Sequence, residues 1–392
     1  MSRSNLPKMK RKPMSKVRLA INAVAFVLVV GLLVMIGLPL YASYMFLDRR
    51  YDDLPQREST EFNIQSQRIT LATSDGLDLA AWRTFADGEF PRDENIDEAD
   101  EAEDADDEDA PRAPVRAVIP AADASEVEAA AAAQAAAAEL PAPKGTVIIL
   151  SGIQRPSVTE FFGYANMLAE HGWDSLLIEL RARGESEGNT IGLAMTEIYD
   201  VEAGIDFLAS DPRVGNLPIV VLGTSAGGST ALAAGGFGHE HIDGVISISA
   251  YCNFTDAYID HAAEMMPRFI PAASRPFMDW YLALRFGSET TAKTPIAALE
   301  YFNDTPLLLM HSTDDYQVPY VHFERLRDVA EAENVPLRTF ARDGDWHFVV
   351  YNQYLETPAQ DTEFAQAIFD YLAQFDGFER EQPEQPEEDA EE

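Results

Sequence analysis

The stretch that decides the fold runs from Pro218 to Ser229 and reads PIVVLGTSAGGS. Residues 218–222 form a short continuous apolar run, which is typical of a strand buried on both faces of a parallel sheet. Residues 229–234 are predicted to begin a helix, and the pattern G-x-S-x-G, centred on Ser225, lies in between. In this context the two glycines allow a tight turn that exposes the serine hydroxyl at the carboxyl edge of a sheet. The competing interpretation is a glycine-rich turn with an ordinary serine.

Strand-like and helix-like segments alternate on both sides of this turn. Apolar runs that predict strands occupy 147–150, 175–178, 245–248 and 307–310, and helical periodicity covers 161–171 and 195–210. Two further β-prone runs, 67–71 and 77–82, flank Asp75-Gly76 and predict a hairpin. Repeated βα units predict an α/β fold with a mostly parallel sheet and helices on both of its faces.

A nucleophilic serine needs a base, and the base needs an acid that orients it. Asp314 and Asp315 follow the predicted strand at 307–310, where either could instead cap the next helix. His347 lies in a later loop, before the last predicted helix. The order serine, aspartate, histidine along the chain is that of one known catalytic architecture, the α/β-hydrolases.

The chain resembles the α/β-hydrolases, in the group with serine aminopeptidase-like and Bem46-like domains. Residues 179–188, ELRARGESEG, are similar to that group's D-x-R-G-x-G-x-S-x-G loop, and residues 311–319, HSTDDYQVP, resemble its H-G-x-x-D-x-x-V-P segment. The second register places the family's acid at Asp315. Two departures stand out: Ser151-Gly152 replaces the usual His-Gly, and Ala182 replaces a loop glycine.

The resemblance implies a serine hydrolase that cleaves an ester, thioester or amide through an acyl-enzyme. Ser225 would attack the carbonyl carbon, His347 would transfer the proton, and Asp315 would orient His347. The backbone N–H groups of Ile153 and Ala226 would hold the oxyanion. No cofactor and no metal is expected. The alternative is a non-catalytic, membrane-anchored binding or scaffold protein with a relic hydrolase domain, which the altered Ser151-Gly152 loop keeps open.

Other residues that could carry chemistry have plainer explanations. His239 and His241 could bind a metal, but a third ligand is not evident from the sequence. His311 is expected to brace the acid loop. Cys252, the single cysteine, excludes an intrachain disulfide and is expected to be a small buried residue.

The N-terminus carries the pattern of a membrane anchor. Seven lysines and arginines precede Leu19, and residues 19–47 contain no charged residue. This run exceeds the ~20 apolar residues that span a bilayer as a helix, and it is too long for the apolar region of a cleaved signal peptide. The positive-inside rule then predicts a cytoplasmic arm at 1–18 and an extracytoplasmic domain, periplasmic if the source is Gram-negative. Residues 48–61 are expected to be a juxtamembrane linker that holds the domain off the surface.

The charge is −37, from 66 acidic and 29 basic residues, which excludes a nucleic-acid binder of the usual kind. The hydrolase domain is expected to span 62–378. An acidic, alanine-rich insertion at 87–144 interrupts it and should be disordered, with its ends close together because they join strands of one sheet. The tail, 379–392, is acidic and also expected to be disordered. Residues 251–300 are expected to form helices that either cover the active site as a lid or only stabilise the sheet.

Overall fold

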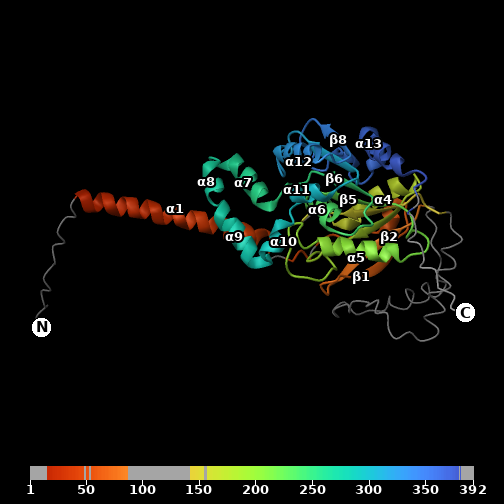
Figure 1. Cartoon of the computed structure of the whole chain (residues 1–392), viewed down its shortest axis with the longest axis horizontal. Helices are drawn as coiled ribbons and strands as arrows, with labels where there is room; N and C mark the ends of the chain where they lie inside the picture. The colour runs from red at the N-terminus through yellow and green to blue at the C-terminus, as the bar shows by residue number, and fades with distance from the viewer. Residues whose placement is uncertain are drawn as a thin grey trace, which may run out of the picture.

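The computed structural model describes residues 16–47, 50–52, 54–86, 142–153, 157–378 and 380. Most of the basic arm, the acidic insertion and the tail lie outside these residues, so the expectations for them remain predictions. Figure 1 shows a long helix, α1, leading into a domain built from a sheet and its covering helices.

One eight-stranded sheet forms the centre of the domain. Its strands are β1 (Gln67–Ala72), β2 (Asp78–Thr84), β3 (Thr146–Leu150), β4 (Asp174–Ile178), β5 (Ile219–Thr224), β6 (Gly244–Ile248), β7 (Leu307–Ser312) and β8 (Leu337–Arg342). The spatial order is β1-β2-β4-β3-β5-β6-β7-β8. The β1–β2 and β2–β4 pairings are antiparallel, and the pairings from β4 to β8 are parallel. The predicted mostly parallel sheet and the hairpin before it are therefore confirmed.

Helices cover the sheet and extend from it. The α-helices are α1 (Lys16–Phe46), α4 (Phe162–Ala169), α5 (Ile198–Ala209), α6 (Ala226–Phe237), α7 (Phe254–Met265), α8 (Phe269–Ala273), α9 (Arg275–Phe286), α10 (Ser288–Ala292), α11 (Pro295–Ala298), α12 (Val321–Ala332) and α13 (Thr362–Leu372). The short 3-10 turns are η1 (Ser59–Phe62), η2 (Val158–Phe161), η3 (Leu299–Tyr301), η4 (Asn352–Tyr354), η5 (Pro358–Gln360) and η6 (Ala373–Phe375). The predicted helix at 195–210 begins at Ile198, and the one expected near Ser229 begins at Ala226.

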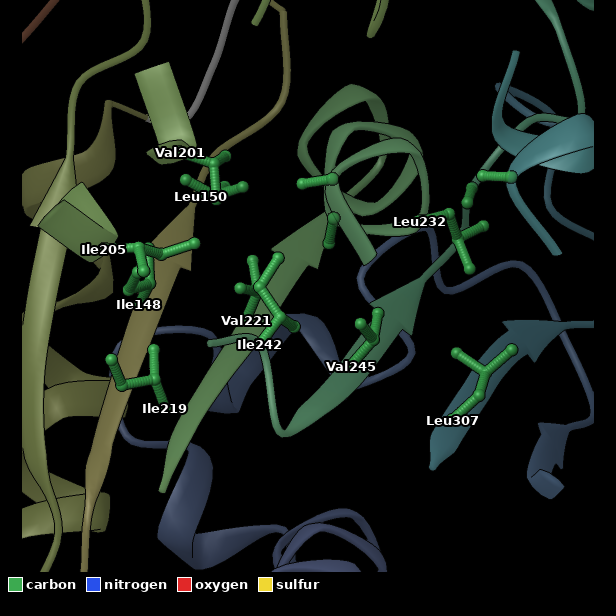
Figure 2. Packing of buried hydrophobic residues seen from close by; sticks show 14 of the residues in the cluster. Ile148, Leu150, Val201, Ile205, Ile219, Val221, Leu232, Ile242, Val245 and Leu307 are labelled. Carbon is green, nitrogen blue, oxygen red and sulfur yellow. The ribbon is translucent and has the colours of Figure 1, made fainter. Parts of the chain in front are cut away.

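The buried strands present alternate side chains to two apolar cores. On one face Ile148 and Val221 pack with Ile205 of α5 and Leu232 of α6 (Figure 2). On the other face the intervening residues, such as Val220, pack with α4 and α13. Because each strand is covered on both sides, its sequence is continuously apolar rather than alternating.

The ends of the insertion lie close together, as expected. The backbone N–H of Ala86 donates to the Asp174 carboxylate (2.9 Å), and that of Lys144 donates to the Gly172 carbonyl (2.8 Å). Both ends therefore meet at the start of β4.

The segment after α1 is not a free spacer. The N–H of Tyr51 donates to the Ala182 carbonyl (3.0 Å), and the Tyr51 carbonyl accepts from Gly184 (2.8 Å). The Arg50 guanidinium donates to the Ser186 carbonyl (2.7 Å). Leu47 is fully buried against the domain. This segment is therefore docked on the domain, and the expectation that it holds the domain off the membrane stays a prediction.

Helix α1 has the length and composition of a membrane span. Within the described residues it is the one such helix, and its segment Lys16–Gly37 has a mean hydropathy of 2.9 with none of it buried. The predicted limits, 19–47, agree with the helix to within a few residues.

Candidate active site

The turn after β5 is sterically demanding. Ser225 adopts φ 55° and ψ −120°, a conformation that costs an ordinary residue ~1–3 kcal/mol. A Cβ on Gly223 would lie 2.0 Å from the Gly227 carbonyl oxygen, and one on Gly227 would lie 2.5 Å from the Leu150 carbonyl oxygen. Only glycine fits at either position, so the turn has the form that the G-x-S-x-G pattern predicts.

Two backbone hydrogen bonds fix this turn. The Ser225 N–H donates to the Ile248 carbonyl at the end of β6 (2.7 Å), and the Ser229 N–H donates to the Ser225 carbonyl (3.0 Å). Helix α6 begins at Ala226, and the first N–H groups of a helix have no acceptor within the helix. The turn thus places N–H groups with partial positive charge next to Ser225.

Asp315 and His347 form a buried pair. The Asp315 Oδ2 accepts a hydrogen bond from His347 Nδ1 at 2.8 Å, and Oδ1 accepts from the N–H groups of Gln317 (2.8 Å) and Val318 (3.0 Å). Burial alone would raise the pKa of Asp315, but the hydrogen bond from His347 and the backbone donor outweigh it, so the pKa lies below its ordinary value. Asp315 is therefore ionised at neutral pH and orients the imidazole.

The neighbouring Asp314 is exposed, and its N–H donates to the Gly344 carbonyl (3.0 Å). Neither aspartate caps α12, whose N-cap residue is Tyr320. The geometry thus distinguishes two acids that the sequence leaves side by side.

His311 braces the acid loop, as predicted. Its Nε2 lies 2.9 Å from the Val318 carbonyl oxygen, and burial lowers the pKa of its imidazole. A neutral imidazole donates from this nitrogen, which ties the end of β7 to the loop that carries Asp315.

The loop that carries His347 is held by residues that the sequence did not single out. Arg342, at the end of β8, donates to the Val349 carbonyl (2.7 Å) and to the Asp361 carboxylate (2.8 Å), and both side chains are buried. Val349 has φ 64°, which is unusual for a β-branched residue. The Ser312 hydroxyl donates to the carbonyl of Trp346 (2.6 Å). Together these contacts fix both ends of the histidine loop.

The candidate residues share one edge of the sheet. Ser225 follows β5, Asp315 follows β7 and His347 follows β8, and β5 to β8 are consecutive parallel strands. Ile153, Ala226 and Val318 pack in one apolar cluster, which brings the loop after β3 and the acid loop to the nucleophile turn.

Known proteins are similar to this chain in sequence or in fold. A family model described as serine aminopeptidase, S33, matches residues 141–301. Among solved structures, an esterase of Pyrococcus furiosus superposes with a TM-score of 0.52 at 15% identity, covering 83% of this chain and 98% of its own. The chain has the α/β-hydrolase fold. The serine aminopeptidase match over residues 141–301, on this fold, supports a serine hydrolase.

Two further proteins are similar to this chain. The acylaminoacyl peptidase of Pyrococcus horikoshii superposes on the hydrolase with a TM-score of 0.50 at 12% identity, covering 81% of this chain and 42% of its own. The uncharacterized protein YqkD of Bacillus subtilis strain 168 is 26% identical over 215 residues, which are 54% of this chain and 68% of that protein.

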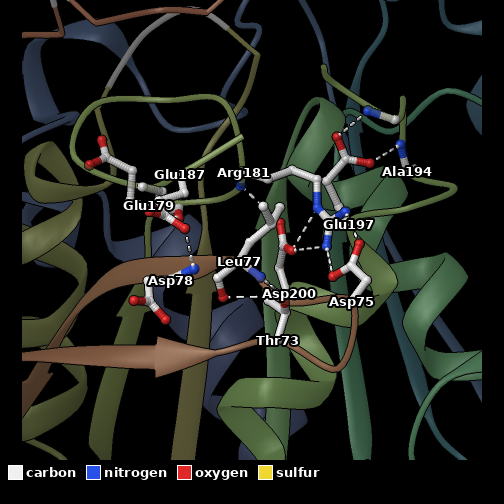
Figure 3. A network of polar contacts seen from close by, with 12 residues as sticks. Thr73, Asp75, Leu77, Asp78, Glu179, Arg181, Glu187, Ala194, Glu197 and Asp200 are labelled. Carbon is white, nitrogen blue, oxygen red and sulfur yellow. Dashed lines mark hydrogen bonds and ion pairs between the residues drawn. The ribbon is translucent and has the colours of Figure 1, made fainter. Parts of the chain in front are cut away.

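The hydrolase's arginine-containing loop, residues 179–188, has a structural role. Arg181 hydrogen-bonds Asp200 (2.8 Å) and Asp75 (2.6 Å), which links the loop to α5 and to the β1–β2 turn (Figure 3). Burial raises the pKa of Asp200 to about 6 against the lowering effect of Arg181. Ala182, which stands where the resemblance has glycine, adopts φ 60°, the left-handed conformation that favours glycine.

The other residues that could carry chemistry, two histidines and a cysteine, do not form a second site. Among the residues that the structure describes, no group of three His, Cys, Asp or Glu side chains could hold a metal ion. His239 Nε2 lies 3.4 Å from Asp206 Oδ1, and its ring centroid lies 4.6 Å from that of His241. Cys252 is fully buried, as predicted, and burial raises the pKa of its thiol to about 12.

Proposed function

We propose that the hydrolase cleaves a carboxylic ester, thioester or amide through an acyl-enzyme on Ser225, with His347 as base and Asp315 as its orienting acid. The observation that carries this proposal is the 2.8 Å hydrogen bond between Asp315 and His347, at the sheet edge that also carries the strained Ser225 turn. A carboxylate on Nδ1 leaves the other ring nitrogen, Nε2, to act on a serine hydroxyl.

In the first step Ser225 Oγ would attack the substrate's carbonyl carbon while His347 Nε2 takes the hydroxyl proton. The C–O, C–S or C–N bond then breaks, and His347 returns that proton to the leaving group. In the second step water attacks the acyl-enzyme, His347 takes a proton from the water, and the acid product leaves as Ser225 regains its hydrogen. The ionised Asp315 stabilises the imidazolium in both steps.

The negative charge on the substrate oxygen needs donors that are already in place. The backbone N–H groups of Ala226 and Ile153 are the proposed donors. Ala226 is the first residue of α6, where the N–H groups have no acceptor within the helix. Ile153 packs against the apolar cluster that contains Ala226. The Ser151-Gly152 sequence before Ile153 keeps the glycine of the usual loop.

We also propose that α1 spans a membrane, with the basic arm in the cytoplasm and the hydrolase domain on the opposite side. The support is seven positive charges before the span, because positive residues near a span are costly to translocate. Alkaline phosphatase fused after Phe378 should be active in cells, and a fluorescent protein that folds only in the cytoplasm should be dark there. The reverse pattern would contradict the orientation.

Kinetics on a substrate panel test the chemistry. Acyl esters of graded chain length and aminoacyl amides, offered to the full chain in detergent, should include a substrate whose hydrolysis Ser225→Ala abolishes. The exposed Ser210 supplies the control, because Ser210→Ala should hydrolyse the same substrate at the wild-type rate. A rate in Ser225→Ala within about tenfold of wild type would exclude the proposed nucleophile. Failure of every ester and amide would favour the binding or scaffold alternative.

A further inference from the structure

Helices α8 and α9 lie beside the membrane helix. Both contact α1, and Figure 1 shows them at the side of the domain where α1 enters it. Met278 and Leu282 of α9 pack in one cluster with Leu47, directly after α1. Helices α8 and α9 thus pack directly beside the anchor.

Helix α9 is apolar on two opposite sides. Met278 and Leu282 face inward and are buried. At ~100° per residue, Trp280 and Leu284 lie on the opposite stripe. They are 63% and 69% exposed, and Phe269 of α8 is 73% exposed. The inward contacts account for only one of the two stripes, and large exposed apolar side chains that gather on one face mark a contact with protein or membrane.

The contacts with α1 reach the level of the bilayer. A helix of 31 residues is ~46 Å long, whereas the hydrocarbon core is ~30 Å thick and needs ~20 residues. Counted from the charged Lys16 and Arg18, the core would end near residue 38. Along α1 the exposed fraction is 60% and 67% at Val24 and Val27 but 40% at both Val30 and Val34. These lower exposed fractions lie inside the apolar segment, near its far end, where Leu33 is still 64% exposed.

The α8–α9 segment is less acidic than most of the hydrolase domain. Residues 265–288 contain three arginines, Arg268, Arg275 and Arg285, and one acid, Asp279, a formal charge of +2. Two of these arginines form ion pairs with acids of α7, Arg268 with Asp260 (2.6 Å) and Arg275 with Asp256. Asp279 accepts a hydrogen bond from the Thr255 hydroxyl (2.8 Å). Arginine near a membrane surface is attracted by anionic lipids, and tryptophan favours the headgroup level.

We propose that α8 and α9 rest on the outer face of the bilayer beside α1, with Phe269, Trp280 and Leu284 among the lipid acyl chains and the arginines at the headgroups. This proposal rests on α1 spanning the membrane and is independent of the chemistry at Ser225. The acidic domain is then held against the surface at one corner, instead of standing off on a flexible stalk.

Depth-dependent quenching in the full chain tests this placement. Single cysteines would replace Phe269 and Leu284, with Val27→Cys on α1 as the probe of the anchor and the exposed Tyr301→Cys on η3 as the aqueous control. Each variant carries an environment-sensitive maleimide fluorophore in phosphatidylcholine–phosphatidylglycerol vesicles. The native Cys252 is buried, and the labelled wild-type chain serves as its blank. Labelling of Ser225 by a fluorophosphonate would be measured separately, so that loss of the hydrolase chemistry is not confused with loss of membrane contact.

We expect brominated acyl chains to quench labels at 269, 284 and 27, and aqueous iodide to quench only the label at 301. If iodide quenched 269 and 284 while brominated lipid quenched 27, the anchor would stand and the proposal would be overturned. Labels at 269 and 284 that are shielded from both quenchers would mean that protein covers this face, which also overturns it. A label at 27 that brominated lipid does not quench would remove the anchor and the proposal together.

Discussion

The carboxyl edge of the sheet and the α8–α9 pair differ in what explains their residues. Around Ser225, contacts within the domain explain the residue types. Gly223 and Gly227 lie against backbone that leaves no room for a side chain, and Asp315 accepts a hydrogen bond from His347. The outward residues of α8 and α9, such as Phe269 and Trp280, are large, apolar and exposed. Packing within the domain therefore does not explain why these positions are apolar. On the proposal made above, contacts inside the domain specify the residues of the first region, and contact with the membrane specifies those of the second.

Asp315→Asn should have the largest effect. The amide cannot stabilise the imidazolium and favours the wrong tautomer of His347, so the hydrolysis rate should fall about 10⁴-fold. Asp314→Asn is the matched control and should stay near wild type, because Asp314 is exposed and makes a backbone contact instead. Steady-state rates on one ester decide the matter, and equal losses in both variants would contradict the assignment of the acid.

Asp361→Asn should destabilise the histidine loop. It leaves the buried Arg342 without its partner, a change that typically costs about 3–5 kcal/mol. Glu363→Gln is the control, because Glu363 also approaches Arg342 but is exposed, and it should cost less than about 1 kcal/mol. Denaturant unfolding in detergent measures both changes.

The cost of Asp361→Asn should also depend on pH. Burial alone would raise the pKa of Asp361, but hydrogen bonds from Arg342 and the backbone lower it below the ordinary value. A depressed pKa gives stability that is present above the unfolded value of about 3.9 and is lost as pH falls through the folded value. The difference between wild type and variant should therefore be constant near neutral pH and shrink below about pH 4. A difference that instead grew on acidification would contradict this role.

The two stripes of α9 should respond differently to truncation in detergent. Met278→Ala removes a buried side chain and should cost about 2–5 kcal/mol of the free energy of unfolding. Leu284→Ala removes an exposed one and should change it by no more than about 0.5 kcal/mol. Equal costs would mean that Leu284 has a partner within the protein.

Ala182→Gly should have the smallest effect. A left-handed conformation costs a non-glycine residue about 1–2 kcal/mol, and glycine gives back part of this through its greater entropy when unfolded. The expected result is a rise of about 0.5 kcal/mol or less in the free energy of unfolding. A loss of stability would show that the methyl group of Ala182 makes contacts worth more than the strain.

The sequence predicted the parts of this molecule whose pattern is local. The buried strands are continuous apolar runs, and the turn at Ser225 follows from two glycines, so both were predictable. Strand β8 was missed because its sequence, LRTFAR, is polar and lies at an edge of the sheet with several residues exposed. Arg342 and Asp361 were missed because their pairing joins residues 19 positions apart, and no local pattern marks it.

The docking of residues 50–52 was missed for a similar reason. Short polar sequence beside a span is typical of a linker, and only the fold shows that Tyr51 and Arg50 meet the loop at 182–188. Helix α1, which this segment joins to the domain, also contacts α9, and the proposed contact of α8 and α9 with the bilayer depends on that arrangement.

The most direct test of the central claim is to locate the adduct of a fluorophosphonate probe on the full chain. The account predicts one adduct per chain, carried by the peptide that contains Ser225, detected by mass spectrometry and absent from Ser225→Ala. It should form far more slowly in Asp315→Asn and at the wild-type rate in Asp314→Asn. An adduct on another residue, or no adduct on a folded protein, would contradict the claim that Ser225 is the nucleophile of this hydrolase.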